Sequence, residues 1–135
     1  MALQCMKMIV SDVLKSLAEC WDSFLDTCYT HVSILEDKIY EQPADESRAP
    51  ELWTNSSLWL KVEKLIWIHS DVVKEVQVHL KDLTADSEDE GGKWIESAKG
   101  DFDRLASLVQ EDLVKPTANL ADLVCTLKRF MWLSI

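Results

Sequence analysis

Apolar side chains recur every three or four residues from about Leu3 to Tyr40, which is the spacing of one helix face. The members of this stripe are Met6, Val10, Val13, Leu17, Cys20 or Trp21, Phe24, Cys28, Val32, Leu35 and Ile39. Steps of four and three alternate up to Phe24, but two steps of four follow each other from Phe24 to Val32, which is a stutter. No Pro or Gly interrupts the run, so the pattern predicts one long helix over about residues 3–40.

The pattern breaks over residues 41–56, where Pro43 and Pro50 flank a polar stretch. We predict a long loop there, followed by a second helix over about residues 57–83. Its expected stripe consists of Leu58, Val62, Leu65, His69, Val72, Val76, Leu80 and Leu83. Further apolar residues widen this face, namely Trp59, Ile66, Ile68, Val73 and Val78. Such width predicts burial on more than one side.

A second break covers residues 84–92, which are acidic and end in a Gly pair. Two shorter apolar stripes follow, and they predict helices over about residues 93–114 and 117–133. Pro116 is expected to end the third helix, so that the last two helices form a hairpin. The fold class predicted is therefore all-α, a four-helix antiparallel bundle with a long first helix and a long first loop, forming one domain over residues 1–135.

The net charge narrows the range of partners. The chain carries 14 basic and 24 acidic residues, a formal charge of −10. Nucleic-acid binding needs a basic surface, so direct contact with nucleic acid is not expected. The acidic excess lies in the first segment and in the two connections, where it would steer basic partners.

No catalytic motif is found in the sequence. Phosphate-binding glycine loops, nucleophile elbows and paired metal-ligand spacings are all missing. Cys28 and His31 are three residues apart and offer half of a zinc site at most. We therefore expect a protein that is not an enzyme and that has no cofactor and no metal site.

The targeting signals indicate a cytoplasmic or nuclear protein. No secretory signal is recognisable, and no apolar run reaches the length of about 20 residues that a membrane span needs. The four cysteines are then expected to be free thiols. Ser87 precedes three acidic residues and is a candidate phosphorylation site.

Six tryptophans are the unusual feature of the composition. Trp59 and Trp67 are eight residues apart on the second helix and are the first candidates for a surface that contacts a partner. Both chain ends are apolar, and they add Met6, Ile9, Val10 and Trp132 to the candidates.

These features predict a non-enzymatic protein–protein interaction module, a small acidic helical subunit or adaptor of a larger complex. It would act through helix packing, either by self-association or by binding a partner helix. The alternative is a bundle that binds a lipid or another apolar ligand between its helices.

Overall fold

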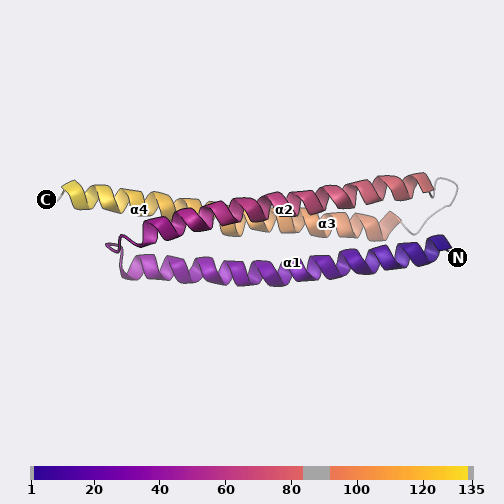
Figure 1. The fold of residues 1–135 in the computed structure, drawn as a ribbon, viewed down its shortest axis with the longest axis horizontal. Coiled ribbons are helices and arrows are strands. Elements are labelled where there is room, and N and C mark those ends of the chain that lie inside the picture. Colours follow the sequence, from indigo (N-terminus) through magenta and orange to yellow (C-terminus); the bar gives the residue numbers. More distant parts are fainter. Residues whose placement is uncertain (1, 84–91, 134–135) are drawn as a thin grey trace. The chain divides into compact units, whose positions relative to one another are not determined.

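The computed structural model describes residues 2–83 and 92–133, and over these residues it contains helices and no strand (Figure 1). The elements are α1 (Ala2–Glu41), α2 (Arg48–Leu83), α3 (Gly92–Leu108), a π-helical segment η1 (Val109–Val114) and α4 (Lys115–Leu133). The all-α prediction is confirmed. The second predicted loop, including Ser87, lies outside the described residues.

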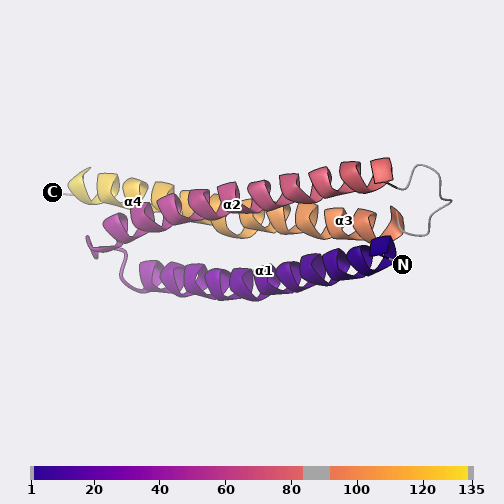
Figure 2. The ribbon, with the colours of Figure 1, turned by 45° about the vertical axis from the view of Figure 1, so that its right-hand side comes forward.

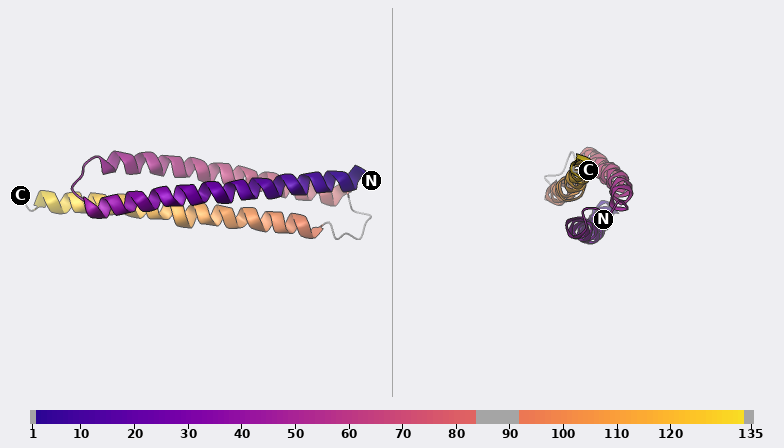
Figure 3. Two further views of the ribbon diagram at one scale, coloured as in Figure 1. Left: turned by 90° about the horizontal axis from the view of Figure 1, so that it is seen from below. Right: turned by 90° about the vertical axis from the view of Figure 1, so that its left-hand side faces the viewer.

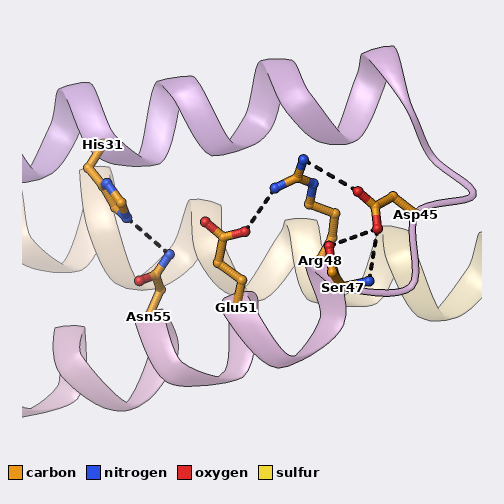
Figure 4. A network of polar contacts seen from close by, with 6 residues as sticks. All are labelled: His31, Asp45, Ser47, Arg48, Glu51 and Asn55. Atoms are coloured by element: carbon orange, nitrogen blue, oxygen red, sulfur yellow. Dashed lines mark hydrogen bonds and ion pairs between the residues drawn. The ribbon is translucent and has the colours of Figure 1, made fainter.

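The first connection is shorter than predicted, because α2 begins at Arg48 rather than near residue 57. Asp45 lies just before this helix, and its carboxylate accepts hydrogen bonds from the Ser47 backbone N–H at 3.0 Å and from the Ser47 hydroxyl at 2.7 Å (Figure 4). Pro50 falls in the first turn, where a backbone N–H would have no partner within the helix. A proline that reads as a loop residue in the sequence is therefore compatible with the start of a helix.

The predicted hairpin turn around Pro116 is not observed. The chain stays helical from Gly92 to Leu133, and the residues before Pro116 form the π-helical segment η1 (Figure 2). The Lys115 N–H bonds to the carbonyl of Gln110, five residues back. A proline inside a helix lacks an N–H and clashes with the carbonyl four residues earlier. The wider π turn accommodates Pro116 without ending the helix.

The chain divides into two compact units, each built from one segment of every long helical stretch. Unit 1 comprises Met1–Phe24 and Lys64–Ser107, and unit 2 comprises Leu25–Glu63 and Leu108–Ile135. Each unit thus packs three helical segments together, and Figure 3 gives further views of these segments. The predicted four-helix arrangement is not seen within either unit.

Polar contacts join all three segments of unit 1. Asp22 of α1 bonds to Arg104 of α3, and Trp21 of α1 bonds to His69 of α2. A third pair connects α2 with α3, because the Gln77 amide donates to the Glu96 carboxylate.

Unit 2 is held by an apolar cluster with members from α1, α2 and α4. These residues are Leu35, Ile39, Ala49, Leu52, Leu120 and Val124, all buried. Beside the cluster, the Asn55 amide lies 3.4 Å from His31 Nε2, and Arg48 bridges Asp45 and Glu51 (Figure 4).

The buried stripe of α1 differs from the predicted one. The residues in the core are Leu14, Ala18, Trp21, Leu25, Cys28, Val32, Leu35 and Ile39. Their steps alternate between four and three without a stutter, so the heptad pattern is continuous. The predicted stripe was correct from Cys28 onward and in its alternative Trp21, but it was wrong at Val13 and Phe24, which are exposed.

Candidate functional site

The structure separates the two tryptophans that the sequence predicts on one surface. Trp59 is only 6% exposed and packs edge-on against His31, so its assignment to a partner-facing surface was wrong. Eight residues turn a helix by 80° beyond two full turns, which is enough to move a side chain off the core. Trp67 is 46% exposed, and the Lys74 ammonium lies 6.0 Å from the centre of its ring. Trp67 is therefore a surface residue with a cation over one part of it.

The other candidates lie near the two ends of the chain. Met6 and Ile9 are exposed on α1, and Val10 is half-buried. Trp132 is 79% exposed on α4, where it lines a shallow hollow with Pro43 and Lys128. Met6 belongs to unit 1 and Trp132 to unit 2.

A second apolar stripe on α1 lies outside the core of unit 1. We call it the outer α1 stripe, and it consists of Met6, Ile9, Val13, Leu17, Cys20 and Phe24. It precedes the core stripe by one residue at several turns, as in Val13 beside Leu14 and Phe24 beside Leu25. Of its members, Leu17 is half-buried and the others are exposed.

Helix α2 carries a corresponding feature in the same unit. We call it the outer α2 stripe, and it consists of Leu65, Ile68 and Val72. All three are exposed, whereas the neighbouring Ile66 and Val73 are buried in the core. The sequence prediction placed Leu65 and Val72 in the stripe of α2 that faces the core, and the structure corrects this assignment.

An apolar groove lies between α1 and α2 in unit 1, and the outer α2 stripe lies on the same side of α2 as His69, which lines the groove. Leu17, Cys20 and Phe24 line it from α1, together with Trp21, and His69 lines it from α2. Its volume is about 240 Å³, and its lining is almost wholly apolar. Periodicity assigned groove residues such as Phe24 and Leu17 to the core, so the sequence did not predict this surface.

One hydrogen bond satisfies the Trp21 indole N–H and the Nδ1 atom of His69 beside the groove. The Trp21 indole N–H donates to His69 Nδ1 at 2.8 Å, and the two rings meet edge to face with their centres 5.5 Å apart. Trp21 itself is buried, and its ring also contacts the edge of Phe24. Because the indole N–H is satisfied within the protein, an apolar side chain can cover it without a desolvation penalty.

An ion pair on the other side of α1 holds this helix against α3. Arg104 makes two hydrogen bonds to the Asp22 carboxylate, at 3.1 and 3.0 Å, and this carboxylate raises the pKa of the guanidinium. Both side chains are about half exposed, so the pair contributes little free energy of folding. The pair shows that α3 packs on the flank of α1 opposite to the residues that line the groove.

The described residues offer little reactive chemistry. They contain no group of three or more His, Cys, Asp and Glu side chains arranged for a metal ion. Cys28 is buried and burial raises the pKa of its thiol, while His31 is exposed, with its Nε2 atom 3.4 Å from the Asn55 amide. No helix among residues 2–83 and 92–133 has the length and apolar character to cross a membrane.

The comparisons with known proteins add no relative. No protein-family model, no curated protein and no solved structure matches the chain. The function must therefore be inferred from the residues of this chain.

Proposed function

We propose that the chain is a non-enzymatic protein–protein interaction module, a small acidic helical subunit or adaptor that acts through helix packing. The observation that supports this proposal is the outer α1 stripe, which is exposed over several helical turns although the same helix has a complete core stripe. A helix that needs only one stripe to fold gains nothing in stability from a second exposed one.

The groove supplies the geometry for such packing. Each unit packs three helical segments, and in unit 1 residues of the outer α1 stripe line an apolar groove. The outer α2 stripe lies on the same side of α2 as His69, which lines the groove from that helix. A helix bound there would give unit 1 the four-helix arrangement that the sequence pattern favours, with the fourth helix supplied by the partner.

Site-specific photo-crosslinking in the cells that make the protein tests the proposal. A photoreactive residue at Val13 or Leu65, both in the outer stripes, is expected to yield discrete adducts with another protein. The same residue at Lys81 or Ser107, which are exposed and lie outside both stripes, serves as the matched control. The proposal is wrong if the stripe positions give no adduct, or no more adduct than the control positions.

A further inference from the structure

The outer α1 stripe, whose residues from Leu17 to Phe24 line the groove in unit 1, has the length of a single bound helix. The outer α1 stripe runs from Met6 to Phe24, about 27 Å at 1.5 Å per residue. A partner helix of about 18 residues would cover it, with apolar side chains at steps of three and four. The ring edges of Trp21 and Phe24 lie near one end of this length, where the bound helix would place its largest apolar side chains.

The exposed charges that flank the two stripes are mainly acidic. On α1, Asp12 and Glu19 lie on the far side of the outer α1 stripe from the core. Around the helix axis, they are about 100° from the centre of this stripe. On α2, Asp71 and Glu75 likewise lie on the far side of the outer α2 stripe from the core, and the basic residue Lys64 lies with them. All five of these side chains are exposed. A helix in the groove would therefore place the flanks of its apolar face next to more negative than positive charge.

The charge balance also decides between a partner and a second copy. The whole chain carries a net charge of −10, so two copies repel each other, and their grooves present the same acidic flanks. A basic segment has the opposite sign and is attracted to these flanks.

We infer that the groove binds one amphipathic helix of another protein, about 18 residues long, whose apolar face is flanked by Lys and Arg. This inference rests on the proposed function and specifies the partner at the same site. The groove supplies the apolar contact, and the flanking acids select the sign of the charges that the helix carries beside its apolar face.

Two synthetic peptides of 18 residues test the inference. Both have Leu at the same helical positions, and the remaining positions are Lys in one peptide and Glu in the other. Calorimetric titration into the full chain at about 0.1 M salt, where the Debye length is about 10 Å, gives their affinities. The Lys peptide is expected to bind at least about tenfold more tightly than the Glu peptide.

Two pairs of variants show whether binding occurs in the groove. Val72→Gln in the outer α2 stripe is expected to weaken the affinity for the Lys peptide by about fivefold or more. Val78→Gln is expected to change this affinity by less than about twofold. Val72 is 50% exposed and Val78 57%, and both lie on α2, but Val78 is on the opposite flank from the groove. If Val72→Gln does not fold by circular dichroism, Val13→Gln takes its place.

The second pair tests the acidic flank. A variant with both Asp12→Asn and Glu19→Gln is expected to bind the Lys peptide with an affinity at least about threefold weaker. Asp37→Asn with Glu41→Gln removes the same charge from α1 but lies in unit 2, and it is expected to have less effect.

The possible outcomes separate the inference from the proposed function. Equal affinities for the two peptides, or equal effects of Val72→Gln and Val78→Gln, would overturn the inference that the groove binds a basic helix. A dimer at about 0.1 M salt that Val72→Gln abolishes would assign the groove to a second copy instead.

If the crosslinks at Val13 form but the two peptides bind equally well, the proposed interaction function stands and the inference of a basic partner is wrong. If the Lys peptide binds as expected but no crosslink forms, the groove selects basic helices and the proposed function fails.

Discussion

At the scale of single residues, the Asp45 carboxylate accepts two hydrogen bonds from Ser47 just before the start of α2. The Ser47 hydroxyl lowers the pKa of Asp45 most, and the Ser47 backbone N–H and the charge of Arg48 lower it further. A carboxylate whose pKa is lowered by folding stabilises the fold above its unfolded pKa of about 3.9. That contribution is lost as the pH falls through the folded pKa.

Ser47→Ala tests this hydrogen bond directly. Removing the hydroxyl is expected to raise the Asp45 pKa towards its ordinary value, because the largest cause of the shift is gone. The measurement is the pH titration of the Asp45 carboxyl carbon by NMR. Ser33→Ala, at an exposed serine of α1, is the control and is expected to leave the titration of Asp45 unchanged. Identical midpoints in all three proteins would contradict the assignment.

Two isoleucines on α2 show how sharply the core of unit 1 is bounded. Ile66 is fully buried and Ile68 is 46% exposed, two positions further along the helix. Ile66→Ala is expected to lower the free energy of unfolding by about 2–5 kcal/mol, and Ile68→Ala by less than about 1 kcal/mol. Urea denaturation of both variants measures the difference. A larger loss for Ile68→Ala would mean that the outer α2 stripe is part of the core.

At the scale of the helices, the positions of α1 and of the end of α2 were predictable, but the buried face of the first half of α1 was not. The reason is that apolar residues stand in adjacent pairs in its first half, Val13 with Leu14 and Phe24 with Leu25. Two stripes displaced by one residue fit the same period, so periodicity alone does not choose between them. The choice depends on contacts distant in the sequence, such as the bond from Trp21 to His69.

The excess of apolar residues on α2 was a sign in the sequence of the exposed apolar surface beside the groove. The apolar face predicted for α2 is wider than one helix interface needs, and this width includes the residues of the outer α2 stripe. The sequence did not predict that Trp59 lies in the core and that Leu65 lies on the surface. Both follow from packing against other helices rather than from local propensity.

The prolines provide a test at the level of whole helices. Pro116 lies inside continuous helical chain next to the π-helical segment η1, whereas Pro50 lies in the first turn of α2. Pro116→Ala restores an N–H and removes a steric conflict, so it is expected to raise the free energy of unfolding by about 1–3 kcal/mol. Pro50→Ala is expected to lower it by about 0.4–1 kcal/mol, because the unfolded chain gains freedom and no helix bond is recovered.

Chemical denaturation gives the sign for each proline variant. Opposite signs would support the interpretation that η1 accommodates a proline within the helix. A loss of stability in Pro116→Ala as large as that in Pro50→Ala would instead mean that the proline is the favoured residue in this turn.

At the scale of the whole molecule, apolar attraction and charge repulsion oppose each other. The outer stripes favour association, while a net charge of −10 on a chain of 15.5 kDa opposes contact between copies. Salt weakens only the second effect, because the Debye length falls from about 10 Å at 0.1 M to about 3 Å at 1 M. The balance between the two effects should therefore be visible in the molecular mass in solution.

We expect light scattering coupled to size exclusion to give a monomer of 15.5 kDa at about 0.1 M salt, over a range of concentrations. At about 1 M salt the mass is expected to rise with concentration, since the outer stripes of two copies can then meet. Val72→Gln is expected to remain monomeric at the higher salt, while Val78→Gln behaves as the unmodified chain. A rise that both variants show equally would mean that association uses another surface, and the acidic charge would then keep copies apart without directing a partner to the groove.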